Sequence, residues 1–88
     1  MTEKTITIAN RAGIHARPAA IIVQVTKNFK SNIYFQKGNN RINAKSIMGI
    51  ITLGAAYGSE IKIIAEGEDE EAVIDSLVGL FESKFEEE

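Results

Sequence analysis

The 88-residue sequence contains no cysteine and only one histidine, His15. Without thiols it can form neither a disulfide framework nor a thiolate metal site. One imidazole is also too few for the multi-histidine sites that hold zinc. We therefore expect no bound metal and no cofactor. The lack of cysteine also agrees with a reducing compartment, which favours a cytoplasmic location.

Two further absences narrow the class of protein. Ten Lys and Arg against twelve Asp and Glu give a net charge of −2, so the basic excess typical of nucleic-acid-binding domains is missing. No apolar run approaches the ~20 residues that a membrane-spanning helix requires. The first residues, Met1 to Lys4, do not have the basic-then-apolar pattern of a secretory leader. We expect no nucleic-acid partner, no membrane insertion and a soluble intracellular protein.

Length limits the kind of site that this protein offers. A chain of 88 residues is expected to form one domain and to bury roughly 60–65 % of the surface of its unfolded chain. Such a core is too small to enclose an active-site cavity between two lobes. We expect a single domain over residues 1–88, acting as a monomer, with a shallow functional site that a partner protein completes.

Hydropathy patterning predicts four strands and two longer helices. Period-two alternation, typical of half-buried strands, is found at residues 5–8, 32–36, 41–43 and 60–65. Apolar residues at three- and four-residue spacing, typical of helices, begin near Ala16 and near Glu70. The predicted buried positions are Ala19, Ile22, Val23 and Phe29 in the first helix and Ile74, Leu77, Val78, Phe81 and Phe85 in the last.

Capping residues add a third, shorter helix. Residues 47–53 are too apolar for a solvated loop, and Ser46 before them is a favoured N-cap. Asp69 is predicted to cap the last helix. The acidic residues at 67–71 and 86–88 are expected to be solvated.

The predicted order of elements is β-α-β-β-α-β-α. Strands that alternate cleanly leave one face of their sheet exposed, so the helices must cover the other face. The predicted fold is therefore of the α/β (α+β) class: an open-faced β-sandwich with a four-stranded, mainly antiparallel sheet and helices on one face.

The segment from Gly13 to Pro18 carries the strongest indication of chemistry. Pro18 lacks an N–H and fits only the first turn of a helix, so the helix begins close to Ala16 and His15 lies at or beside its N-cap. Free backbone N–H groups and the positive end of the helix dipole make this position an anion site. The same field favours a neutral imidazole. Arg17 adds a guanidinium whose donors match phosphate oxygens.

A nucleophile, an anion cradle and a guanidinium are what a phosphoryl carrier requires, because phosphoryl transfer depends mainly on positioning and charge neutralisation. The alternative is that His15 is an ordinary capping or surface histidine and that Pro18 only starts the helix. Ser46 likewise has two interpretations. It is either a structural N-cap worth roughly 1 kcal/mol, or a phosphorylation site at a helix start that accommodates the added charge.

Six side chains beside these positions are predicted to contact a partner. The short helix is unusually apolar for a surface, and apolar patches rimmed by charge are typical of interfaces. Ile50 and Leu53 of that helix are instead expected in the core. For the positions on the first helix, the alternative is an ordinary solvated surface. The predicted contacts are Ile47, Met48, Ile51, Ala20, Gln24 and Lys27.

Two motifs together resemble one protein family. Gly13-Ile14-His15-Ala16-Arg17-Pro18-Ala19 resembles the active-site signature of the HPr family, the histidine-containing phosphocarriers of the phosphoenolpyruvate-dependent sugar phosphotransferase system. Asn43-Ala44-Lys45-Ser46-Ile47-Met48-Gly49 resembles the family's second signature, around a regulatory serine. The resemblance covers nearly the whole chain, including the spacing of the two motifs. Ala12 departs from it, because many members have Ser or Thr there.

The resemblance implies a function and a set of partners. Enzyme I would phosphorylate Nδ1 of His15, with phosphoenolpyruvate as the ultimate donor, and enzyme IIA proteins would receive the group during sugar uptake. Arg17 would stabilise the phosphate. Ser46 would be phosphorylated by an ATP-using HPr kinase/phosphorylase in carbon catabolite regulation. A carrier of this kind is modified in every cycle and is not an independent turnover enzyme.

Two other functions remain as alternatives. One is a regulatory binding module that acts through phospho-Ser46 on a transcription factor or sensor. Family relatives specialised in this way lack the active-site histidine, so His15 and Arg17 favour the carrier. The other is a small histidine-dependent hydrolase, which is disfavoured because no second general base or metal cluster is evident.

Overall fold

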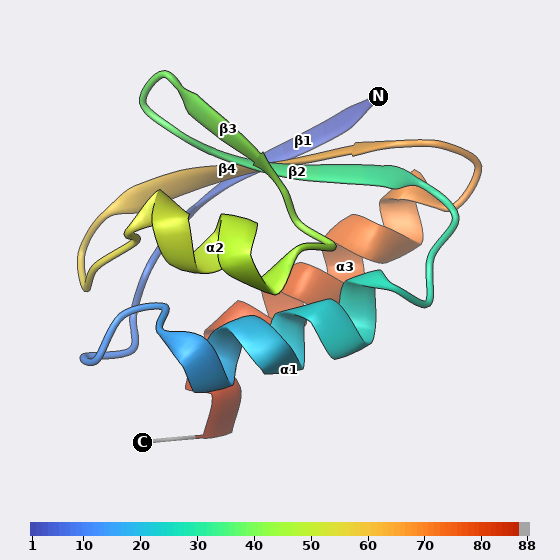
Figure 1. Cartoon of the computed structure of the whole chain (residues 1–88). Helices are drawn as coiled ribbons and strands as arrows, with labels where there is room; N and C mark the ends of the chain where they lie inside the picture. Colours follow the sequence, from blue (N-terminus) through green and yellow to red (C-terminus); the bar gives the residue numbers. More distant parts are fainter. Residues whose placement is uncertain (87–88) are drawn as a thin grey trace.

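Four antiparallel strands form one sheet in the computed structural model, which describes residues 1–86. They are β1 (Thr2–Thr7), β2 (Asn32–Lys37), β3 (Asn40–Asn43) and β4 (Glu60–Glu66), arranged in the order β1-β4-β2-β3. Helices α1 (Ala16–Thr26), α2 (Ile47–Leu53) and α3 (Glu70–Glu82) cover one face of the sheet (Figure 1), and a short 3-10 turn, η1 (Lys84–Glu86), follows α3. The predicted element order and open-faced architecture are confirmed. Residues 87–88, part of the predicted acidic tail, lie outside the described residues.

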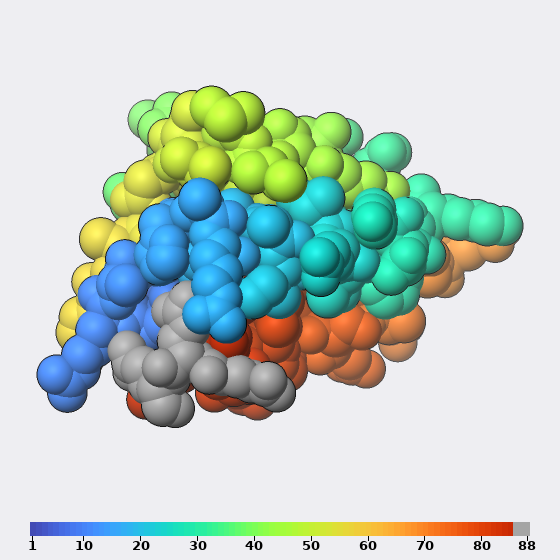
Figure 2. All heavy atoms as spheres, turned by 60° about the horizontal axis from the view of Figure 1, so that its bottom comes forward, coloured from blue at the N-terminus to red at the C-terminus, as the bar shows by residue number. Residues whose placement is uncertain are grey.

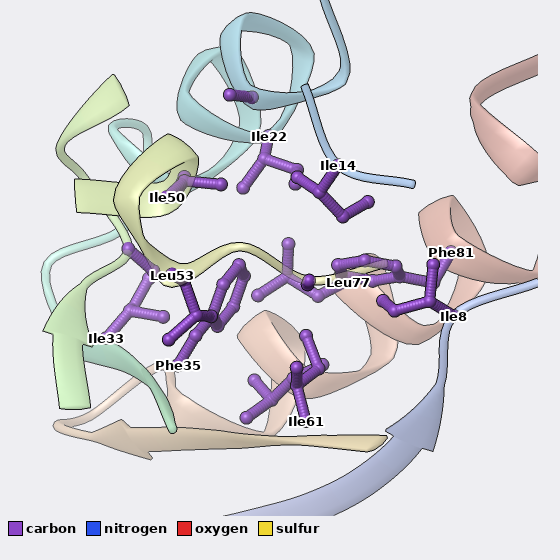
Figure 3. Close-up of a cluster of buried hydrophobic side chains, with 14 of the residues drawn as sticks. Ile8, Ile14, Ile22, Ile33, Phe35, Ile50, Leu53, Ile61, Leu77 and Phe81 are labelled. Atoms are coloured by element: carbon purple, nitrogen blue, oxygen red, sulfur yellow. The ribbon is translucent and has the colours of Figure 1, made fainter. Parts of the chain in front are cut away.

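The covered face of the sheet and the inner sides of the helices share one hydrophobic core (Figure 3). The register pairs Phe35 with Ile63 and Ile33 with Ala65, and all four side chains are buried. The ring of Phe35 meets that of Phe81 on α3 edge to face, with the centroids 5.9 Å apart. The helices contribute Ala19, Ile22, Ile50, Leu53, Ile74 and Leu77, all as predicted, together with Val73.

The limits of the first strand differ from the prediction because pairing with β4 sets them. The sequence predicts a strand at residues 5–8, but β1 extends back to Thr2, which pairs with Ala65. The strand ends before Ile8, whose N–H instead donates to the carbonyl of Ser59 at 2.8 Å. Alternation in the sequence reveals which residues face the core, but it does not reveal how far the partner strand continues.

The last helix is shorter than its apolar pattern suggests. α3 ends at Glu82, and Phe85, predicted on its buried face, lies in η1 with a positive φ of 57°. The ring of Phe85 is nevertheless buried, 5.1 Å from that of Phe81 between centroids. Val73, which the prediction omits, is fully buried, whereas Val78 is only partly so. The chain therefore changes direction after α3 and still returns an aromatic ring to the core.

The carboxylate of Asp69 does not cap α3 as predicted. Asp69 occupies the N-cap position but makes no side-chain bond to its own helix. It accepts N–H bonds from Lys30 at 2.8 Å and from Ser31 at 3.0 Å, and the Ser31 hydroxyl also donates to it. The Ser31 hydroxyl, followed by the Lys30 N–H, lowers the pKa of Asp69. The carboxylate therefore joins the start of α3 to the connection between α1 and β2.

Glu70 joins α3 to the edge strand β1. Its carboxylate accepts bonds from the hydroxyl of Thr2 and from the N–H of Gly67 at 3.2 Å, and it lies 3.0 Å from the ammonium group of Met1. These contacts, the Thr2 hydroxyl foremost, lower the pKa of Glu70 from 4.5 to about 2. The acidic stretch at 67–71, predicted to be solvated, thus includes two carboxylates that hold neighbouring elements together.

The Glu70 contacts should make stability depend on pH in the acid range. A carboxyl group with a depressed folded-state pKa stabilises the fold above its unfolded pKa, and this contribution is lost as the pH falls from 4.5 toward about 2. In urea unfolding, Glu70→Gln should therefore be less stable than the wild type at pH 7, and the difference should shrink over that interval. Glu71→Gln, one residue further along α3, is the control. A difference for Glu70→Gln that persists unchanged in acid would contradict the assignment.

Candidate functional site

His15 is the N-cap residue of α1. Its backbone is extended, with φ −107° and ψ −161°, and its carbonyl accepts the N–H of Ala19 at 3.0 Å. In this geometry the N–H groups of Ala16 and Arg17 have no intrahelical acceptor, and Pro18 has no N–H. The helix start predicted from Pro18 is confirmed. His15 thus lies where two backbone donors and the positive end of the dipole face outward.

The candidate site is on open surface. His15 and Arg17 are exposed, whereas Pro18 and Ala19 are buried. Within residues 1–86 the guanidinium of Arg17 has no carboxylate partner. Two hollows, one between β1 and α3 and one on the exposed face of the sheet, do not include His15. An anion bound here would therefore remain accessible to another protein.

The loop before α1 is bonded to the segment that follows α2. The N–H and the carbonyl of Ile8 bond to Ser59 and Gly58 at 2.8 and 2.9 Å, and the N–H of Ile14 donates to the carbonyl of Ala55 at 2.8 Å. These are backbone bonds between segments far apart in the sequence. They connect the start of α1 with the end of α2.

Gly13 lies close against the segment that follows α2. Its φ is +71°, and a Cβ at this position would lie 2.9 Å from the carbonyl oxygen of Ala55 and 3.1 Å from the Cα of Ala56. On the other side of the same turn, the Gly13 N–H donates to the carbonyl of Asn10 at 3.0 Å. The left-handed backbone and the lack of space both require glycine here.

Ser46 caps α2, as predicted. Its hydroxyl oxygen accepts the N–H of Gly49 at 3.0 Å. Gly49 lies close to this hydroxyl, since a Cβ there would be 3.3 Å from Ser46 Oγ. The helix ends at Gly54, which has the left-handed conformation common at helix C-termini. Ser46 is partly exposed, so its hydroxyl has a structural role at the edge of the surface.

Helices α1 and α2 adjoin each other, and α3 lies on the other side of α1 (Figure 2). On α2, Ile47 is 41 % exposed and Met48 65 %. Ile51 is only partly exposed, because it packs against the core. The predicted contacts on α1 are the partly buried Ala20 and the exposed Gln24, and the exposed Lys27 is the C-cap residue that follows the helix. Two neighbouring helices therefore carry five of the six predicted contact residues, and Lys27 directly follows one of them.

Asn10 and residues 55–59 have no functional role predicted from the sequence. Asn10 is only 1 % exposed, and its amide Nδ2 donates to the carbonyl of Gly13 at 2.7 Å. A local signal for this turn exists, because Asn followed closely by Gly is typical of turns in which the Asn side chain bonds the backbone. The bonds to residues 55–59 leave no such signal, since their partners are brought together only by the fold.

The start of α1 therefore offers one imidazole, outward-facing backbone donors and a guanidinium. Such a set suits the reversible attachment of an anionic group to the imidazole. Among residues 1–86, no group of three His, Asp or Glu side chains is placed to hold a metal ion. In the same part of the chain, no helix has both the length and the apolar character needed to cross a membrane.

Comparison with known proteins gives a consistent match. A family model described as "PTS HPr component phosphorylation site" matches residues 2–83. The chain is 49 % identical over 88 residues to the phosphocarrier protein HPr of Treponema pallidum, covering 100 % of both chains. It is also 39 % identical over 84 residues to the HPr-like protein Crh of Halalkalibacterium halodurans, covering 96 % of this chain and 100 % of the relative.

Solved structures agree with the sequence matches. The fold resembles HPr-C-His from Thermoanaerobacter tengcongensis with a TM-score of 0.96 and 55 % identity, over 100 % of this chain and 99 % of that one. A dimer of HPr from the same organism matches with a TM-score of 0.77 and 54 % identity, over 97 % of this chain and 98 % of that one. The solved structures of HPr from this organism, which are 54–55 % identical to the present chain, thus include a dimer.

Gly13→Ala should lower the free energy of unfolding by more than Gly38→Ala does. Both glycines have positive φ, +71° and +59°, so each substitution meets the left-handed backbone cost of about 1–2 kcal/mol. At Gly38 nothing lies within 4 Å of the new Cβ, whereas at Gly13 the new Cβ meets backbone atoms. Overpacking of this kind at Gly13 should add about 1–3 kcal/mol to the loss of stability. Urea unfolding measures the difference. Equal losses would show that the approach of Gly13 to Ala55 does not constrain the loop.

Proposed function

The chain belongs to the HPr family, the phosphocarriers of the phosphotransferase system, and we propose that it carries the phosphoryl group on Nδ1 of His15. Enzyme I is the proposed donor, and enzyme IIA proteins in sugar uptake are the proposed acceptors. The observation that carries this proposal is the position of His15 at the N-cap of α1, two residues before Arg17. We place this relay in the cytoplasm, with the carrier working as a monomer.

The geometry supports each step of such a transfer. The imidazole nitrogen attacks phosphorus on the donor, so that a P–N bond to His15 forms as the bond to the donor breaks. The phosphoryl oxygens then face the N–H groups of Ala16 and Arg17 and the Arg17 guanidinium, which neutralise their charge. The later step to the acceptor reverses these bonds. An open site is required, because the donor and the acceptor must approach the same nitrogen in turn.

Partner docking is proposed on the surface that adjoins His15. Ile47 and Met48 expose apolar side chains on α2, and burying them against a partner would be favourable. Gln24 lies near the C-terminal end of α1, and Lys27 is the C-cap of that helix. Ala20 and Ile51 are partly buried, and we assign them smaller contributions at the same interface.

Ser46 supports a second, regulatory function. Phosphorylation by an HPr kinase/phosphorylase would add a charge of about −1.5 to −2 next to the apolar contacts Ile47 and Met48. Repulsion from acidic partners and the cost of desolvating the phosphate would then weaken docking. A protein that acts mainly as a regulatory binding module through phospho-Ser46 is the alternative. The presence of both His15 and Arg17 favours carriage with regulation added.

Phosphorylation by enzyme I and phosphoenolpyruvate tests the carrier. The wild type should gain an acid-labile, alkali-stable phosphoryl adduct, and His15→Ala should gain none. Arg17→Glu should slow the reaction by roughly 10²-fold, as loss of an oxyanion-stabilising donor commonly does, without loss of stability. Arg41→Glu on β3 makes the same charge change away from the site and should react normally. An unmodified wild type with competent enzyme I would refute the carrier.

Phosphorylation by HPr kinase and ATP tests the regulatory site. The wild type should be modified on Ser46, and the modified protein should accept phosphoryl groups from enzyme I more slowly. Ser46→Ala should resist modification and lose about 1 kcal/mol of stability with the N-cap bond. Ser46→Asp should keep a capping acceptor and also react slowly with enzyme I. Normal reactivity of both the phosphorylated protein and Ser46→Asp would exclude this regulation.

A further inference from the structure

The peptide unit between Gly13 and Ile14, one residue before His15, is held from both sides. The unit consists of the carbonyl of Gly13 and the N–H of Ile14. Its oxygen accepts the side-chain amide of Asn10 at 2.7 Å, and its N–H donates to the carbonyl of Ala55 at 2.8 Å. Because the donor and the acceptor of the same rigid plane are both bonded, the plane cannot rotate without breaking one of these bonds.

Burying the polar side chain of Asn10 is unfavourable unless its amide forms hydrogen bonds. Its side chain is 1 % exposed, and its bond to Gly13 is itself buried. The carbonyl of Asn10 also accepts the Gly13 N–H at 3.0 Å, so Asn10 bonds both polar groups of Gly13. A buried carbonyl that lost the amide would be left unsatisfied, which is unfavourable. The contact therefore determines how the turn at residues 10–13 is closed.

Ile14 is the one residue between the bonded carbonyl of Gly13 and His15. Ile14 is 7 % exposed and points into the core toward Ile22 (Figure 3). On the other side, the carbonyl of His15 is bonded to the N–H of Ala19 at 3.0 Å. The backbone of His15 is thus held before and after its Cα, which fixes the direction in which the imidazole leaves the chain.

We propose that Asn10 is a positioning residue for phosphoryl transfer at His15. In this role, which rests on the proposed carrier function, Asn10 aligns the imidazole with the backbone donors and the guanidinium at the start of α1. Asn10 itself does not touch the phosphoryl group. Its loss should leave docking intact and misalign the attacking nitrogen, and displacements of this kind slow transfer steeply.

Thr26 provides a matched control. Its hydroxyl donates to the carbonyl of Ala44 at 2.9 Å, and its side chain is fully buried at the C-terminal end of α1, away from His15. Asn10→Ala and Thr26→Ala each remove one buried side-chain donor from a backbone carbonyl. A general loss of stability should therefore affect both variants, whereas a change in imidazole alignment should affect only the first.

The experiment measures phosphorylation of the full chain by phospho-enzyme I over a range of carrier concentrations. Asn10→Ala should lower kcat about tenfold or more with little change in KM, and Thr26→Ala should keep the wild-type kcat. Hydrogen exchange supplies a readout independent of activity. The Ile14 amide should exchange faster in Asn10→Ala, relative to the amides of the sheet, and not in Thr26→Ala.

The outcomes separate this inference from the function it rests on. Equal kcat for the two variants, an effect of Asn10→Ala on KM alone, or an unchanged Ile14 exchange rate would overturn the role of Asn10. A wild type that is not phosphorylated would instead refute the carrier function. If Asn10→Ala does not fold, Asn10→Ser, which keeps a donor of shorter reach, replaces it in the same comparison with the same outcomes.

Discussion

A four-stranded sheet with one covered face restricts where everything else in this protein lies. β4 and β2 occupy the middle of the sheet, and Phe35 and Ile63 on these strands need to be buried on the same side. All three helices must therefore share that side, with α1 adjoining both α2 and α3 (Figure 2). The helix that begins at His15 and the helix that Ser46 caps become neighbours as a consequence of core burial.

The same arrangement brings the connecting segments together at one end of the helical layer. The loop before α1 and the segment after α2 bond to each other through backbone groups, at Ile8 and at Ile14. Ile8 and Ile14 are buried, and buried backbone groups must find hydrogen-bond partners. Here the segment after α2 supplies these partners. The result is a hydrogen-bonded backbone support beneath the exposed His15, which suits the proposed carrier function.

Two N-cap residues show when the local sequence predicts a capping bond correctly and when it does not. Ser46 was predicted to cap α2, and its hydroxyl does bond the N–H of Gly49. Asp69 is an equally good capping residue by type, yet its carboxylate bonds Lys30 and Ser31 from another part of the chain. The difference is competition, because two backbone N–H groups from another segment bond to Asp69, whereas the donor bonded to the Ser46 hydroxyl oxygen is the N–H of its own helix. Phe85 differs for a similar reason, because the core receives its ring although α3 has ended.

The sequence by itself determined the order of elements, most of the core positions of the helices and the start of α1, because periodicity and the missing N–H of Pro18 act over a few residues. It also marked His15, Arg17 and Ser46 as candidate site residues, because residue type and position at a helix start are both readable from the sequence. Only the tertiary structure decided the extent of β1, the partners of Asp69 and Glu70, and the support of His15 by Asn10 and Ala55. Those contacts depend on which backbone and side-chain groups meet across the fold, and hydropathy does not encode that information.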